Sequence, residues 1–188
     1  MQRPSGLIDR IIGMARLSHL VRRFFGSLRP GGPAASEQKW AEAQLLPAER
    51  EIWVSLSGPD RRHSAAVARR VQAALGPSAS RPVLAAALLH DCGKLQSGLR
   101  TPGRVVATVL SVSVVKSDSD AKRWSASSSS WKRAVGEYRR HPEFGALLLT
   151  EAQSDPLTVT WTREHHMAPT AWSLEPTIAS ALHEADDD

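Results

Sequence analysis

The spacing of apolar residues along the chain predicts helices from end to end. Between Gly6 and Leu28, large apolar residues recur every three or four positions with arginines between them, which is the pattern of a basic amphipathic helix. Such a helix either packs on its own domain or on a second subunit, or lies on a membrane surface. Proline and glycine at 29–33 then break the pattern. We therefore predict a basic helix with its linker over residues 1–33 and a separate domain over residues 36–188.

The first half of this domain shows three helical segments. A helix opens at Ser36 and ends or restarts at Pro47, and Asp60 is expected to cap a helix over residues 61–75. The run over residues 83–89 is rich in alanine and leucine and holds a single β-branched residue. A short apolar run of this composition predicts a buried helix rather than a strand.

The second half is less regular at its start. Residues 96–130 show no clear period, and residues 117–130 are so rich in serine, aspartate and lysine that we expect an exposed, mobile loop there. Further helices are expected near 142–152, 156–166 and 175–186, each with a proline close to its start. No repeat and no convincing strand pattern is present, so the predicted fold is all-α, a helical bundle preceded by the amphipathic helix.

Composition narrows the class of protein. With 188 residues, 41% of them hydrophobic and 23% charged, the chain is long enough to bury a core and too apolar for a disordered protein. A single cysteine excludes an intramolecular disulfide framework. No apolar run reaches the length of a membrane span, and arginines interrupt the apolar runs of the N-terminus, which therefore lacks the pattern of a signal peptide, so the expected location is the cytoplasm. The membrane interpretation of the first helix would place the protein at the inner face of the membrane.

The net charge of +5 permits an anionic partner without choosing one. Aromatic residues make up only 5% of the chain, and no basic stripe is interleaved with them. This argues against nucleic acid as the partner and leaves a small phosphorylated molecule or an anionic membrane surface.

Candidate chemistry lies in polar residues on the apolar faces of the predicted helices. An isolated imidazole or carboxylate is costly to bury unless it is paired or bound to a metal. Several such groups on separate helices can converge on one metal site. The residues on, or at the end of, core-facing stripes are His63, His90, Asp91, His141, His165 and Asp186. His166 extends the set as the neighbour of His165, whereas His19 and His183 are interpreted as ordinary surface residues.

Five blocks of sequence carry a resemblance to a known family. They are His63, Leu88-Leu89-His90-Asp91-Cys92-Gly93-Lys94, Arg140-His141-Pro142-Glu143-Phe144-Gly145-Ala146-Leu147-Leu148, Glu164-His165-His166 and Ala185-Asp186. In this order they resemble the HD-domain metal-dependent phosphohydrolases, and the third and fourth blocks resemble the HD-GYP branch of that superfamily. The resemblance spans roughly residues 59–188 and implies an HD-domain-like helical bundle.

The chain departs from the branch at three places. The Gly-Tyr-Pro block is absent, because His166 is followed by Met167-Ala168-Pro169. Efficient hydrolysis of cyclic di-GMP is therefore not expected. Pro59 stands where some relatives carry a metal-binding glutamate, so a third metal is not expected either. The stretch between Lys94 and His141 is rearranged or extended, which leaves its substrate contacts unassigned.

The resemblance implies a site with two divalent ions bridged by Asp91. His63, His90 and Asp186 would hold one ion, and His141, His165 and His166 the other. Imidazole and carboxylate ligands suit Fe, Mn, Ni, Co or Zn.

The implied reaction is attack of a metal-bridging hydroxide on a phosphomonoester or phosphodiester of nucleotide-like chemistry. Asp91 and Lys94 are the expected catalytic residues, and Lys94 either neutralises a phosphoryl oxygen or forms a structural ion pair with a ligand carboxylate. Cys92 is assigned to packing. The alternative is a signalling or scaffold module that keeps the fold without turnover, recruited to membranes by its first helix.

Overall fold

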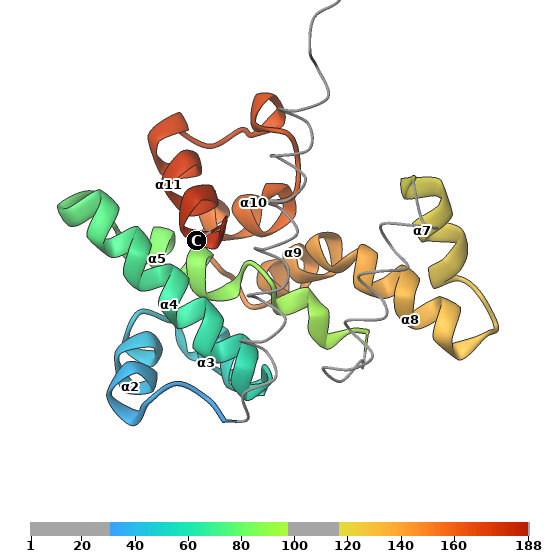
Figure 1. Ribbon diagram of the computed structural model, residues 1–188, viewed down its shortest axis with the longest axis horizontal. Coiled ribbons are helices and arrows are strands. Elements are labelled where there is room, and N and C mark those ends of the chain that lie inside the picture. The colour runs from blue at the N-terminus through green and yellow to red at the C-terminus, as the bar shows by residue number, and fades with distance from the viewer. Residues whose placement is uncertain (1–30, 98–116, 188) are drawn as a thin grey trace, which may run out of the picture.

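We describe the protein from a computed structural model, which defines residues 31–97 and 117–187 (Figure 1). These residues form an all-α structure, as predicted, with helices and short 3-10 turns only. In chain order the α-helices are α2 (Ala35–Ala43), α3 (Pro47–Ser55), α4 (Gly58–Leu75), α5 (Arg81–Leu89), α7 (Asp118–Ser125), α8 (Ser130–Arg139), α9 (His141–Glu151), α10 (Pro156–Glu164) and α11 (Pro176–Asp187). The 3-10 turns are η1 (Gly76–Ser78), η2 (Cys92–Leu95) and η3 (Pro169–Ala171).

Most helix boundaries fall close to the predicted ones. Pro47 is the first residue of α3, and prolines occupy the first or second position of α9, α10 and α11, where a missing N–H costs nothing. The prediction that Asp60 caps α4 is wrong. The cap is Ser57, whose Oγ accepts a hydrogen bond from the backbone N–H of Asp60. Ser57 precedes Gly58-Pro59, and proline fits the first turn of a helix better than the segment before it.

The prediction of an exposed loop over residues 117–130 is also wrong. Helix α7 occupies most of this segment, and α8 follows it as an antiparallel partner that the apolar pattern had not indicated. Two buried side chains, Ala121 and Val135, form a small core of their own with half-buried Trp124 and Tyr138 packed against it. Figure 1 shows this α7–α8 hairpin projecting sideways from the other helices.

The main core surrounds α5. All residues from Val83 to Leu89 are buried, in agreement with the predicted buried helix. Large side chains from surrounding helices close over it, among them Trp53 of α3, Leu149 of α9 and Leu182 of α11. The two residues that follow α5, His90 and Asp91, are buried as well.

The predicted basic helix over residues 6–28 lies outside the described residues, as does most of the irregular stretch after Lys94. The division into residues 1–33 and 36–188 therefore stays a prediction. Within the described ranges, no helix combines the length and the apolar character that crossing a membrane requires.

Candidate metal centre

The predicted ligands lie at one place in the structure, in two adjoining groups. In each group the ligand atoms all lie within 4.8 Å of one another. The first group, which we call the Asp91 group, consists of Asp91, His141, His165 and His166. The second, which we call the Asp186 group, consists of His63, His90 and Asp186. His90 and Asp91 are neighbours in sequence, so the two groups share a boundary.

Helix ends place most of these residues. His90 is the C-cap of α5, His165 is the C-cap of α10, and His141 is the first residue of α9 directly after α8. His63 comes from the second turn of α4, and Asp186 from the last turn of α11. A helix end directs a side chain inward while the chain itself turns away. Several short helices can therefore deliver ligands to one point.

Three of the imidazoles are fixed by the backbone in the same way. The Nδ1–H of His90 donates to the carbonyl of Ala87 at 2.9 Å. The Nδ1–H of His141 donates to the carbonyl of Tyr138 at 2.7 Å, and that of His165 to the carbonyl of Thr162 at 2.9 Å. Each acceptor lies three residues back, at the end of a helix, where carbonyls lack intrahelical partners. A carbonyl can only accept, so each Nδ1 carries the proton.

This arrangement leaves the second ring nitrogen, Nε2, of all three histidines facing inward. The Nε2 atoms of His90, His141 and His165 are buried and make no hydrogen bond. An unsatisfied buried polar atom costs about 1–3 kcal/mol, and here three of them meet at one carboxylate. A histidine that donates through one ring nitrogen and presents the other is the usual form of a metal ligand. The donor set therefore fits a divalent transition metal.

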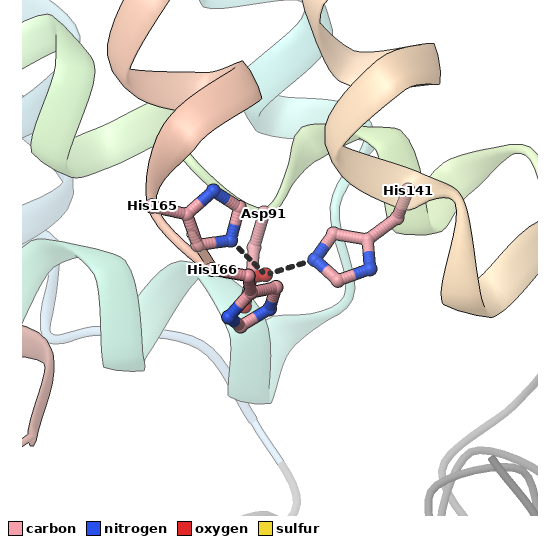
Figure 2. Close-up of side chains that lie close together, drawn as sticks. All are labelled: Asp91, His141, His165 and His166. Carbon is pink, nitrogen blue, oxygen red and sulfur yellow. Dashed lines mark ion pairs between the residues drawn. The ribbon is translucent and has the colours of Figure 1, made fainter. Parts of the chain in front are cut away.

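Asp91 lies between the two groups. Its Oδ1 is 3.1 Å from the Nε2 of His141 and 3.8 Å from that of His165, whereas its Oδ2 is 3.5 Å from the Nε2 of His90. Figure 2 shows the rings of His141 and His165 turned toward this carboxylate, with His166 beside them. Each oxygen of Asp91 thus serves a different set of imidazoles. The bridging role that the resemblance implied for Asp91 stays a prediction.

The Asp186 group has one buried member where the Asp91 group has three, and two of its residues are already hydrogen-bonded to each other. The Oδ1 of Asp186 hydrogen-bonds the Nε2 of His63 at 2.9 Å and lies 3.5 Å from the Nε2 of His90. The side chains of His63 and Asp186 are 28% and 16% exposed. The backbone of α11 is held close to α4 by Arg70, whose Nε–H donates to the carbonyl of Ala185. Docking of α11 therefore decides where Asp186 lies.

The charges of the cluster are unequal. Burial opposes charging of His90, but the carboxylates of Asp91 and Asp186 prevail and raise the pKa of His90 to about 10. Burial lowers the pKa of His141 to about 4, despite the nearby Asp91, and also lowers the pKa of His165. Burial opposes charging of Asp91 as well, yet Lys94 and His90 hold the pKa of Asp91 well below its usual range. His141 and His165 are therefore neutral at physiological pH, the form that binds a metal, whereas His90 is protonated in the metal-free protein and would release its proton on binding one.

The ring nitrogens give a direct test of this geometry. In long-range ¹H–¹⁵N spectra, the protonated nitrogen of His141 should be Nδ1 at every pH above about 4, and that of His165, whose pKa is also lowered, should be Nδ1 at neutral pH. Addition of Zn²⁺ should move the Nε2 resonances of these residues and leave their Nδ1 protons in place. Rings found mainly protonated at Nε2 would contradict the assigned hydrogen bonds.

Lys94 lies against Asp91 rather than free in the site. Its Nζ forms an ion pair with Asp91 Oδ2, and 14% of its side chain is exposed. The structure therefore contains the ion pair that was one of its two predicted roles. Cys92 is fully buried beside α9, and burial raises the pKa of its thiol above the ordinary range. A neutral, enclosed thiol agrees with its assignment to packing.

Sequence reasoning missed several contributors. The carbonyl of Tyr138 orients His141 from the end of α8, a helix the apolar pattern did not indicate. Gly93 allows η2 to lie against α9: a Cβ built on it would be 1.9 Å from the carbonyl oxygen of His141. The glycine in the His-Asp-x-Gly-Lys block was the available signal. His183 lies on α11 and belongs to neither ligand group.

Comparisons with known proteins add no relative. No protein-family model, no curated protein and no solved structure matches this chain. Membership of the HD-domain family consequently stays a prediction. What the structure shows is a buried cluster of histidines and aspartates, on an all-helical fold, that can hold a metal ion.

Proposed function

We propose that this protein is an HD-type metal-dependent phosphohydrolase that cleaves a phosphomonoester or phosphodiester of nucleotide-like chemistry. The observation that carries the proposal is the placement of Asp91, whose two carboxylate oxygens face different sets of buried imidazoles. A carboxylate in this position is the type of ligand that two divalent ions share. A structural site for one metal would need only one of the two ligand groups.

Each group supplies the ligands of one ion. His141, His165 and His166 would hold one together with Asp91 Oδ1, and His63, His90 and Asp186 would hold the other together with Asp91 Oδ2. Two bound divalent ions lower the pKa of water and offset the charge of a phosphoryl group. The chain contributes a rigid frame, because the backbone carbonyls that bind the Nδ1–H groups fix three of the rings.

Two further residues suit an anionic substrate. Lys94 places a positive charge directly beside the ligand carboxylate, where it would attract a phosphate and offset its charge. His166 is the exposed member of the Asp91 group, whereas the other three members are buried. This indicates that substrate approaches from the side of His166, the side open to solvent.

The segment after His166 favours a substrate other than cyclic di-GMP. It lacks the Gly-Tyr-Pro block and instead forms η3, and the carboxylate of Glu164 closes the segment by accepting hydrogen bonds from the N–H and the hydroxyl of Ser173, both at 2.7 Å. Contacts remote from the reacting atoms position the phosphate, and a misplacement of about 1 Å costs on the order of a hundredfold in rate.

Metal-loaded protein should therefore hydrolyse a generic ester, such as p-nitrophenyl phosphate or a nucleoside monophosphate, faster than cyclic di-GMP. His165→Ala should abolish this turnover because it removes a ligand of the Asp91 group. His183→Ala is the matched control, since this histidine lies on α11 outside both groups, and it should keep the wild-type rate. The measurement is initial rate per metal-loaded chain.

Two outcomes would count against the proposal. Absence of turnover on every phosphate ester tested, with metal bound, would favour the non-catalytic signalling module. Efficient cleavage of cyclic di-GMP would overturn the substrate argument while leaving the metal centre intact.

A further inference from the structure

The α7–α8 hairpin carries a surface that the metal centre does not use. Over residues 117–140 the sequence holds six basic and three acidic residues. The helices that follow it are the reverse, because residues 141–187 hold eight acidic residues and one basic residue, whereas residues 31–97 are closer to balance with six acidic and eight basic residues. Figure 1 shows the hairpin projecting from the other helices.

The basic side chains of the hairpin are available to a partner. Lys122, Lys132, Arg133 and Arg139 are exposed, and none of them forms an ion pair within the parts of the chain that the structure describes. Arg123, by contrast, pairs with Asp120 in the preceding turn. The hairpin therefore presents four positive charges that its own acidic residues do not neutralise.

An exposed tryptophan lies among these charges. Trp131 is 52% exposed, the largest aromatic side chain that the described residues leave open to solvent. Its ring meets Trp124 edge to face at 5.5 Å, and the Nζ of Lys132 lies 5.8 Å from the ring of Trp131 and 6.0 Å from that of Trp124. A tryptophan with an apolar body and a polar N–H, flanked by lysine and arginine, is typical of side chains at a membrane–water interface.

The hairpin is rigid enough to present this surface as a unit. Gly136 of α8 lies directly against α7, and a Cβ built on it would be 2.3 Å from the backbone nitrogen of Ser125. Arg140 also joins the two helices, since its Nη1 donates to Ser125 Oγ at 3.1 Å. The surface therefore does not have to order its own backbone when it binds, which avoids an entropic cost.

We propose that the α7–α8 hairpin docks the protein on anionic phospholipid. Two other anionic partners, single-stranded nucleic acid and an acidic protein, fit this surface less well. Single-stranded nucleic acid needs successive open aromatic rings on which bases stack, and the hairpin leaves only Trp131 exposed among its described residues. A folded acidic protein needs a broader complementary face than one narrow hairpin provides. The sequence of residues 1–30 adds apolar residues and six arginines against one acidic residue, a composition that also suits an anionic lipid surface.

Docking by the hairpin would orient the metal centre. From Trp131 to Arg139 the helix rises about 12 Å, and its end at Tyr138 contacts His141 of the Asp91 group, with the two ring centres 5.8 Å apart. The acidic segment over residues 141–187 would stay away from a negative surface, because like charges repel. The inference concerns this surface alone and does not depend on turnover at the metal centre.

The test uses the full chain and two kinds of vesicle. In flotation assays, wild-type protein should bind vesicles made of equal parts of phosphatidylcholine and phosphatidylglycerol, and should not bind pure phosphatidylcholine. The double variant Lys132→Glu with Arg133→Glu should lose at least about tenfold in apparent affinity, because each basic residue near the surface contributes to attraction. The matched control, Lys39→Glu with Arg163→Glu, makes the same change of charge on exposed residues of the bundle and should bind like wild type.

Depth of insertion is measured through Trp131. Brominated phosphatidylcholine mixed into the anionic vesicles should quench tryptophan fluorescence, and Trp131→Phe should remove most of the quenched component. All variants should keep their helical circular dichroism and metal content, so that loss of binding is not loss of fold.

Three results would overturn the proposal. One is the absence of binding to anionic vesicles by wild-type protein. Another is equal binding by the hairpin variant and the control variant, which would assign any membrane contact to residues 1–30. The third is tighter binding to a single-stranded oligonucleotide than to anionic vesicles, with the same dependence on Lys132 and Arg133, which would make the hairpin a nucleic-acid surface.

Discussion

Replacing Asp91 by asparagine should empty both halves of the metal centre. The substitution keeps the shape of the side chain and removes the charge that both groups of imidazoles face. Loss of a residue that only orients a ligand typically costs ten- to a hundredfold in metal affinity or activity. Loss of the shared ligand itself should lower both metal affinity and activity by more than about a hundredfold. Metal content, which we expect to be one to two ions in the wild-type chain, should fall close to zero in elemental analysis, and ester hydrolysis should fall with it.

The matched control for this variant is Asp187→Asn. Asp187 is 63% exposed, follows Asp186 directly and belongs to neither ligand group, so its substitution should leave metal content unchanged. Asp186→Asn should fall between the two, because it removes a ligand of one group only. Full metal content in the Asp91→Asn protein would mean that this carboxylate is not a ligand, and the two-ion arrangement would then be wrong.

Gly93→Ala should damage the centre without touching a ligand. A Cβ at this position would lie 1.9 Å from the carbonyl oxygen of His141 and 2.5 Å from the backbone nitrogen of Gly145. Both contacts are to backbone, so η2 and α9 have to separate. Overpacking of this kind costs about 1–3 kcal/mol of stability. Because His141 moves with α9 and Asp91 with η2, the Asp91 group should also lose metal affinity. The measurements are chemical denaturation and metal titration.

Gly32→Ala controls for the loss of a glycine. Its Cβ would meet the Nη2 of Arg61 at 3.3 Å, and that atom is the end of a flexible side chain, so a small shift relieves the contact. This variant should keep wild-type stability and metal content. A Gly93→Ala protein with the same properties as Gly32→Ala would show that the close approach of η2 and α9 is not needed.

The sequence predicted the helices that face the main core better than those that do not. Val83 to Leu89 form a continuous apolar run, and burial of such a run is nearly obligatory, so α5 was predictable. Helices α7 and α8 have no comparable run. Their pairing depends on two small buried side chains, Ala121 and Val135, and on a close backbone approach at Gly136, which no periodicity reveals. Serine and aspartate favour turns in isolation, and tertiary packing overrides that preference here.

The polar residues that gather at the candidate site were predictable for a related reason. Histidine or aspartate on a core-facing stripe is costly when isolated, so each such residue signals a partner. What orients the ligands was not predictable, because the acceptors are backbone carbonyls. Every residue has a carbonyl. Only the fold decides that the carbonyls of Ala87, Tyr138 and Thr162 accept a hydrogen bond from the histidine three residues later.

The position of Asp186 on α11 has a consequence for the order of folding. Its hydrogen bond to His63 joins residues that are 123 positions apart in the chain, so it forms only after α11 has docked on α4. The Asp91 group needs fewer helices: it is complete once α9 and α10 have packed around the end of α5. Contacts between distant parts of a chain form slowly, because the chain loses the entropy of closing the loop before the contact stabilises the fold. During refolding in the presence of metal, the Asp91 group should therefore bind its ion before the Asp186 group does. The delay between the two binding steps would measure how long α11 takes to dock.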